Sequence, residues 1–123
     1  ANANGKVTNP YMIERTTGVT GSTSYEAKTT YGDDIFSADV ASQIKQIMRQ
    51  NGQDRYGDIG YPVGVKSGTA QVQNGASENS LLVGFNDDAS LPIAFCVVIE
   101  DRVSGEVSTS DIVSTMLHAL NKQ

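Results

Sequence analysis

Apolar and polar residues alternate over much of the second half of the chain, and this pattern predicts β-strands. Three strands are expected, at residues 63–72, 80–85 and 91–100, with turn-forming segments between them. The last run is apolar almost throughout, so we expect it to be buried on both faces and central in its sheet. The expected fold class is α/β in the loose sense (α+β), an antiparallel meander with 63–72 at one edge and helices packed against it.

A helix is expected before the first of these strands, at residues 38–50. Ser37 is a suitable N-cap, and Asp39 in the first turn favours the helix dipole. Asn51 and Gly52 are expected to end the helix. Its apolar residues recur at helical spacing and form one stripe, made of Val40, Ile44, Ile47 and Met48.

A second helix is expected near the end of the chain, where a serine within 108–110 can cap it. Its apolar residues would cover one face of the sheet, and they are Ile112, Val113, Met116, Leu117 and Leu120. His118 falls on the opposite side of this helix. Because no ligand partner stands at metal-binding spacing from it, we expect His118 to be solvated.

The first third of the chain gives weaker patterns. Residues 1–5 resemble the end of a helix closed by Gly5, which suggests that the chain is part of a larger protein. The following elements are expected to be a short extended segment at 7–13, a loop at 16–24, a short strand at 25–31 and a turn at 32–34.

Composition and charge narrow the function classes. A chain of 123 residues is most simply one domain or part of one, and its 38% hydrophobic content without tryptophan predicts an aliphatic core. The net charge of −5 argues against nucleic acid or an anionic membrane as the main partner.

The single cysteine, Cys96, lies in an apolar run, so we expect a buried thiol. No apolar run approaches the length of a transmembrane helix, and the first residues do not have the pattern of a signal peptide.

The candidate chemistry lies on the first strand of the meander, in the run Lys66-Ser67-Gly68-Thr69. In an extended strand Ser67, Thr69 and Gln71 share one side, and the long stem of Lys66 can bend round the strand edge. Hydroxyls and an ammonium suit a carboxylate, and the glycine leaves room for a close approach. An edge strand that carries lysine as protection against aggregation explains the tetrapeptide equally well.

The run Val65-Lys66-Ser67-Gly68-Thr69-Ala70-Gln71 resembles the K-[ST]-G motif of penicillin-binding protein transpeptidase domains. Other segments resemble the neighbouring elements of that family: 3–7 with Pro10-Tyr11, 36–48, 82–85, 92–94 and 111–120. The resemblance extends over most of the chain. It identifies residues 1–123 as the C-terminal portion of such a domain, and implies a five-stranded sheet in the complete domain.

The resemblance implies a serine acyl-enzyme that cross-links peptidoglycan and is acylated by β-lactams. Lys66 would set the electrostatics beside the serine of the family's S-x-N motif. Ser67 and Thr69 would bind the substrate carboxylate, with Gly68 and Gln71 completing the substrate-binding strand, and the backbone NH of Thr69 would be one oxyanion-hole donor. The implied ligands are a D-Ala-D-Ala stem peptide and β-lactams. No cofactor or metal is expected, and the protein would be extracytoplasmic and membrane-anchored through a segment absent from this chain.

Two other family motifs occur here as bare patterns, and we reject both. Ser42 to Lys45 fits S-x-x-K but lies on a helix that resembles a different family helix. Ser77 to Asn79 fits S-x-N but follows the lysine motif and is expected in a hairpin loop. The chain is therefore expected to lack the nucleophile, to be inactive alone, and to need the missing N-terminal part of its domain.

Several alternatives stay open. A D,D-carboxypeptidase, a β-lactamase or a β-lactam sensor shares the same motif strand. A non-catalytic binding or assembly module would keep the strand without the reaction.

The acidic pairs 33–34, 87–88 and 100–101 are expected to be turn and strand-end acids. The outer edge of strand 91–100 would be open in this chain alone, which predicts dimerisation or strand exchange through it.

Overall fold

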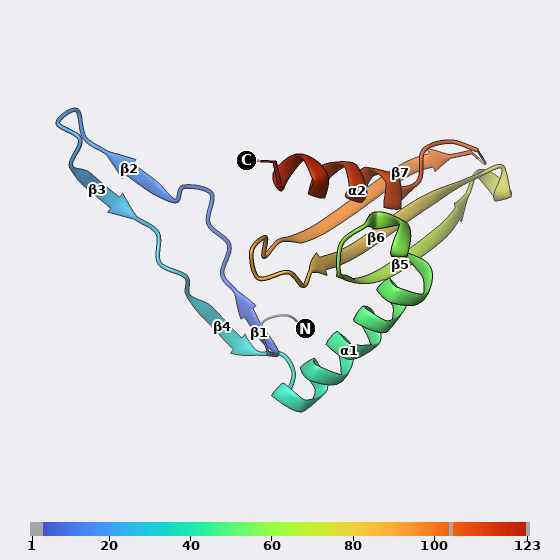
Figure 1. Ribbon diagram of the computed structural model, residues 1–123, viewed down its shortest axis with the longest axis horizontal. Coiled ribbons are helices and arrows are strands. Elements are labelled where there is room, and N and C mark those ends of the chain that lie inside the picture. The colour runs from blue at the N-terminus through green and yellow to red at the C-terminus, as the bar shows by residue number, and fades with distance from the viewer. Residues whose placement is uncertain (1–3, 104, 123) are drawn as a thin grey trace. The chain divides into compact units, whose positions relative to one another are not determined.

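The protein is described by a computed structural model covering residues 4–103 and 105–122, which divides into two compact units at residues 43 and 44. The element order is β1 (Lys6–Thr8), β2 (Arg15–Thr17), β3 (Thr23–Glu26), β4 (Tyr31–Asp34), α1 (Ala38–Arg55), η1 (Gly57–Ile59), β5 (Val63–Val72), η2 (Gln73–Gly75), β6 (Ser77–Asn86), β7 (Ala94–Arg102) and α2 (Thr109–Leu120) (Figure 1).

The first unit contains two small antiparallel ribbons, β1 with β4 and β2 with β3. The expected loop at 16–24 is correct for residues 18–22, which form the turn of the β2–β3 hairpin, and wrong at its two ends, which belong to the strands. The Thr16 and Ser24 hydroxyls lie 2.9 Å apart across the strands, and Gly21 takes a positive φ of 80° in the turn.

Four other expectations for this unit are corrected or limited by the structure. The segment at 7–13 forms a strand only over Lys6–Thr8, and the expected strand at 25–31 is divided between β3 and β4. The expected turn at 32–34 belongs to β4. Residues 1–3 of the expected helix end lie outside the described residues, and Gly5 has a φ of 90°.

The second unit is built on a three-stranded antiparallel sheet in the order β5-β6-β7. The meander and the edge position of β5 are therefore confirmed, and β5 has the predicted bounds, Val63–Val72. The middle strand β6 is longer than predicted, because its first residues continue the ladder with the far end of β5.

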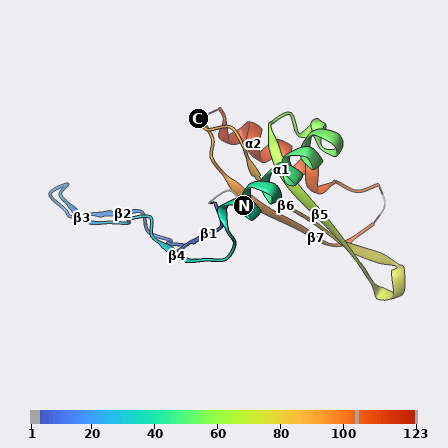
Figure 2. The ribbon, with the colours of Figure 1, turned by 90° about the horizontal axis from the view of Figure 1, so that it is seen from below.

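The core lies between this sheet and α2, which crosses one sheet face (Figures 1 and 2). Of the predicted helix residues, Val113 and Leu117 are fully buried and Met116 packs against them. They contact sheet residues whose side chains share a face, including Val65 and Leu82. The helix begins as predicted, with Ser108 as the N-cap of a capping box.

The expectation that strand 91–100 is buried on both faces is wrong for this chain, whereas the expectation that its outer edge is open in this chain alone is confirmed. β7 is an edge strand, and its residues alternate between half-buried and exposed. Phe95 and Val97 face the core, whereas Cys96 and Val98 are exposed. The expected burial of the Cys96 thiol is wrong for the same reason: α2 covers the other face of the strand.

Helix α1 differs from its prediction in length and in its buried side. It begins at the predicted place, where the Val40 NH donates to the Ser37 hydroxyl at 3.3 Å, but it continues through Asn51 and Gly52 to Arg55. Ile47 of the predicted apolar stripe is 69% exposed. The side of α1 that packs includes the buried Gly52, which has no side chain and so lets the helix approach the backbone of Val63 closely.

Candidate functional site

The run Lys66 to Thr69 lies in the middle of β5, on the edge that no strand of the described chain covers. In the ladder Lys66 pairs with Val83 and Gly68 with Leu81. The side-chain amide of Asn51 donates to the Val65 carbonyl at 3.0 Å, so this carbonyl points away from β6. Because an antiparallel strand turns alternate residues to each side, the NH and C=O groups of Ser67 and Thr69 also point to the open edge.

The side chains of this run concentrate hydrogen-bond donors at the same edge. Ser67 is half-buried, and Lys66, Thr69 and Gln71 are exposed. The Lys66 ammonium donates to the Ser67 carbonyl, so the lysine stem bends round the strand to the open side. One positive charge, two hydroxyls and the outward NH groups of Ser67 and Thr69 therefore lie along one strand edge, an arrangement suited to a carboxylate.

The glycine of this run is not explained by packing, unlike two other glycines of the sheet. A Cβ on Gly64 would overlap the ring of Phe85, and one on Gly84 would lie within 2.9 Å of Phe95. A Cβ on Gly68 would meet only Leu81, at an ordinary contact distance of 3.7 Å. The described fold therefore tolerates a side chain at 68, and its absence leaves the open edge accessible from that side.

Gln71, the last predicted site residue, lines a separate cavity of about 350 Å³ near the β5–β6 turn. An ion pair between Arg102 and Glu78, with 3.2 Å between nitrogen and oxygen, lies in its wall. In Figure 2 this end of the hairpin extends beyond the part of the sheet that α2 covers. The structure thus brings Lys66, Ser67 and Thr69 together and places Gln71 at the margin of the group.

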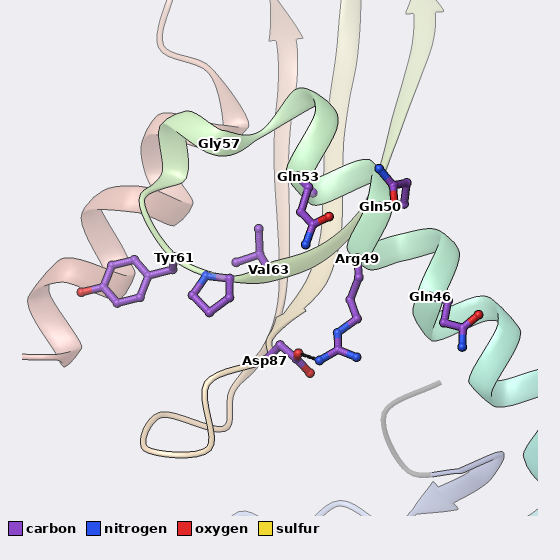
Figure 3. A pocket seen from close by; sticks show the side chains of 10 residues that line it. Gln46, Arg49, Gln50, Gln53, Gly57, Tyr61, Val63 and Asp87 are labelled. Atoms are coloured by element: carbon purple, nitrogen blue, oxygen red, sulfur yellow. Dashed lines mark hydrogen bonds and ion pairs between the residues drawn. The ribbon is translucent and has the colours of Figure 1, made fainter.

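A larger cavity of about 620 Å³ lies beside the start of β5 (Figure 3), and the sequence patterns did not indicate it. One face of α1 supplies Gln46, Arg49, Gln50 and Gln53 to its wall. The Arg49 guanidinium forms an ion pair with Asp87, which also lies 3.3 Å from the Lys45 ammonium. The spacing of these helix residues by three and four positions was the available signal. Because its carboxylate is paired with two cations, Asp87 supports the junction of α1 with the β6–β7 loop.

Neither of the two rejected motif matches lies on β5. Ser42 is exposed on α1. Ser77 and Asn79 lie within β6, not in the hairpin loop that we expected. Both bind Asp101: the Ser77 hydroxyl donates to its carboxylate at 2.9 Å, and its NH donates to the Asn79 side chain at 3.1 Å. These two side chains therefore have a structural role at a strand end.

The remaining titratable candidates also have structural contacts. The ring of His118 lies 5.1 Å from that of Tyr61 and is exposed. The backbone NH and then the hydroxyl of Ser90 donate to the Asp88 carboxylate and lower its pKa, as expected for a turn acid. Among the described residues, no group of three acids, histidines or cysteines is arranged to hold a metal ion. None of the described helices combines the length and apolarity that a membrane crossing requires.

Comparison with known proteins gives a consistent family. The model of the penicillin binding protein transpeptidase domain matches residues 1–118. The D,D-transpeptidase domain of a peptidoglycan glycosyltransferase from Eggerthella lenta aligns with a TM-score of 0.78 and 25% identity, over 98% of this chain and 29% of that chain.

Two structures of penicillin-binding protein A from Mycobacterium tuberculosis also share the fold. The imipenem acyl-enzyme complex aligns with a TM-score of 0.77 and 16% identity, over 95% of this chain and 27% of that chain. A second structure aligns with a TM-score of 0.70 and 16% identity, over 94% and 29%. No curated protein matched the chain. The chain spans less than a third of the length of these solved structures.

Proposed function

The chain belongs to the penicillin-binding protein transpeptidase domain family, and we propose that it supplies the substrate-binding strand of a serine D,D-transpeptidase. The reaction is the cross-linking of peptidoglycan through an acyl-enzyme. In this proposal residues 1–123 are the C-terminal portion of the domain. The observation that carries the proposal is the open edge of β5, where the Lys66 ammonium reaches the Ser67 carbonyl beside two hydroxyls and outward NH groups.

Each residue of this edge has a role that its chemistry supports. The Ser67 and Thr69 hydroxyls would bind the terminal carboxylate of a D-Ala-D-Ala stem peptide or the carboxylate of a β-lactam. The outward NH of Thr69 would donate to the oxyanion of the tetrahedral intermediate, in which negative charge develops on the former carbonyl oxygen. The positive charge of Lys66 would favour both anions and lower the pKa of a neighbouring serine. Gly68 would leave space for the substrate backbone.

The nucleophile would come from the N-terminal part of the domain. The serine of an S-x-x-K motif would attack the D-Ala-D-Ala carbonyl and release the terminal D-alanine, and an amine of a second stem peptide would then take the acyl group. The chain alone is therefore inactive in this proposal. Peptidoglycan lies outside the cytoplasmic membrane, so the protein would be extracytoplasmic and membrane-anchored outside this chain. The missing part of the domain would also pair with the outer edge of β7.

The test uses the full-length protein that contains this chain and a fluorescent penicillin. Ser67→Ala removes a hydroxyl donor to the carboxylate, and a hydrogen bond to a charged group contributes about 1.5–3 kcal/mol. We therefore expect the acylation rate constant, measured at low penicillin concentration, to fall by about tenfold or more. Ser114→Ala is the matched control, because it removes a half-buried hydroxyl of α2 that donates to the Ile59 carbonyl of η1, away from this edge. The labelling rate of this variant should stay at the wild-type value.

Five results would overturn parts of the proposal. Equal labelling of wild type and Ser67→Ala would exclude this edge as the carboxylate site. A folded full-length protein that takes no label would indicate a non-catalytic module. Labelling of residues 1–123 alone would place the nucleophile in this chain and return attention to Ser42. Rapid hydrolysis of the label would indicate a β-lactamase, and release of D-alanine from a stem peptide without cross-linking would indicate a carboxypeptidase.

A further inference from the structure

We propose that Asn51 is a positioning residue for acylation, which acts by holding α1 against the edge of β5 and so fixes the Ser67–Thr69 edge. The inference rests on the proposed function of that edge. Asn51 itself is not expected to touch the substrate. Its side chain contacts the backbone one residue before Lys66, and no pattern around the K-S-G-T run points to it.

The first observation is the bond between Asn51 and β5. The Asn51 side-chain amide donates to the Val65 carbonyl at 3.0 Å, in a partly buried position and across 14 residues of sequence. This carbonyl belongs to the outward-facing series of the strand, the same series as Ser67 and Thr69. Asn51 therefore occupies the first part of the edge that a substrate would otherwise reach.

The second observation is the close approach of the next helix residue. Gly52 is buried, and a Cβ there would overlap the carbonyl oxygen of Val63. Val63 also belongs to the outward-facing series, two residues before Val65. Asn51 and Gly52 thus contact consecutive outward carbonyls of β5. Asn51 forms a hydrogen bond with one, and Gly52 approaches the other closely because it has no side chain.

The third observation is that this pair of residues lies inside a helix. Asparagine and glycine have low helix propensity, and together they ordinarily mark a helix end. Yet α1 continues for three residues beyond Gly52, to Arg55. Larger or better helix formers would strengthen α1 locally, but they would lose the bond to Val65 or collide with Val63. The contacts with β5 explain why these two residues stand inside the helix, which helix stability alone does not explain.

These contacts determine where the open edge of β5 begins. Val63 and Val65 are covered by α1, and the edge becomes accessible at Ser67. The proposed oxyanion donor, the Thr69 NH, is four residues beyond the Val65 anchor along the same strand, a span of roughly 13 Å. Because a displacement of about 1 Å can lower a reaction rate about 100-fold, loosening the anchor should reduce acylation more than it reduces folding.

The experiment compares Asn51→Ala with wild type in the full-length protein by stopped-flow mixing with a fluorescent β-lactam. The initial dissociation constant and the acylation rate constant at saturation are measured separately, and active protein is counted by end-point titration. We expect the acylation rate constant to fall about tenfold, with less than a threefold change in the dissociation constant. A purely structural role would lower only the amount of active protein.

Asn86→Ala is the matched control. Its side-chain amide also donates to a backbone carbonyl at 3.0 Å, that of Leu91, but on the β6–β7 side of the sheet. This variant should keep the wild-type acylation rate constant in the protein that folds. If Asn51→Ala does not fold, Asn51→Asp keeps the side-chain shape and removes the donor, and the same fall in rate constant is expected.

The outcomes separate this inference from the proposed function. If Ser67→Ala slows acylation but both Asn51 variants react at the wild-type rate, the positioning role is wrong and the function of the edge stands. If Ser67→Ala has no effect, the proposed function fails first. If Asn86→Ala slows acylation as much as Asn51→Ala, the effect belongs to general loosening of the sheet, and the positioning role is again wrong.

Discussion

The ring of Phe85 covers the backbone of Gly64, its partner across the β5–β6 ladder. Phe85 is 3% exposed, and the Lys45 ammonium lies over its ring, 5.5 Å from the ring centre. An aromatic ring over a cross-strand glycine compensates for the packing that glycine lacks. This stack joins α1 to the sheet two residues before the candidate site, so a glycine is required at 64 for a structural reason.

Gly64→Ala should therefore destabilise the protein. A Cβ at this position would overlap three ring atoms of Phe85, and overpacking of this kind costs about 1–3 kcal/mol. The measurement is the free energy of unfolding in urea. Gly68→Ala is the matched comparison, because its Cβ would only touch Leu81; we expect a change within about 0.5 kcal/mol. Equal losses in the two variants would contradict the packing argument.

Asp87 connects two cations of α1 to the loop after β6. Its side chain is 14% exposed and pairs with Arg49 and Lys45. Asp87→Asn should lower the free energy of unfolding by about 1 kcal/mol. The loss is no larger because both ion pairs are partly exposed, so water screens the attraction between their charges.

A double-mutant cycle with Arg49→Gln separates the pair from other effects of each change. We expect a coupling energy of about 0.5 kcal/mol that decreases at high salt. Additive effects of Asp87→Asn and Arg49→Gln would show that this ion pair contributes nothing to the junction.

The parts of the fold that followed from the sequence are those with local signals. The strand at 63–72, the Ser108 cap and the buried positions Val113 and Leu117 each depend on alternation, helical spacing or capping within a few residues. The apolar run of β7 was misread because apolarity does not say which other element covers a face. α2 covers the side of Phe95 and leaves Cys96 exposed.

The candidate site also has a part with a local sequence signal and a part without one. The run Lys66 to Thr69 is contiguous, so its motif and its strand could be recognised together. Asn51 was interpreted as a helix end, because its contact with Val65 spans 14 residues and no local pattern encodes it. The same long-range contact explains why the helix continues where propensity predicts its end.

The cap of α2 predicts a specific dependence of stability on pH. The Ser108 hydroxyl and then its backbone NH donate to the Asp111 carboxylate, and they hold the pKa of Asp111 below its ordinary value. The folded state thus favours the ionised carboxylate. The resulting stability is complete above the unfolded pKa of about 4 and is lost as the pH falls through the lower folded pKa.

Asp111→Asn removes this dependence while it keeps the size of the side chain. We expect wild type to have the higher midpoint of thermal unfolding at pH 7, and the difference from Asp111→Asn to shrink below about pH 4. Using the difference removes the contribution of Asp88, which titrates in the same range in both proteins. A difference that stays constant from neutral to acid pH would show that the cap does not depend on the charge of Asp111.

The open edge of β7 predicts association of the isolated 123-residue chain. The Val65 carbonyl points away from β6, so the backbone groups of its ladder partner Gly84 point toward Phe95 of β7. By the alternation of the ladder, the NH and C=O groups of Ala94, Cys96 and Val98 therefore point outward. An apolar strand with free backbone groups pairs readily with a second copy. We expect the isolated chain to sediment as a dimer.

Val98→Lys should shift the isolated chain to the monomer, because a charged side chain on an edge strand opposes pairing. Val107→Lys is the matched control: Val107 is 55% exposed and lies between β7 and α2, so the same change there should leave the dimer intact. Sedimentation equilibrium of the three proteins measures the effect. Because the proposal pairs this edge with the missing part of the domain, the full-length protein should show no such dependence on Val98; a monomeric wild-type chain at every soluble concentration would refute association through β7.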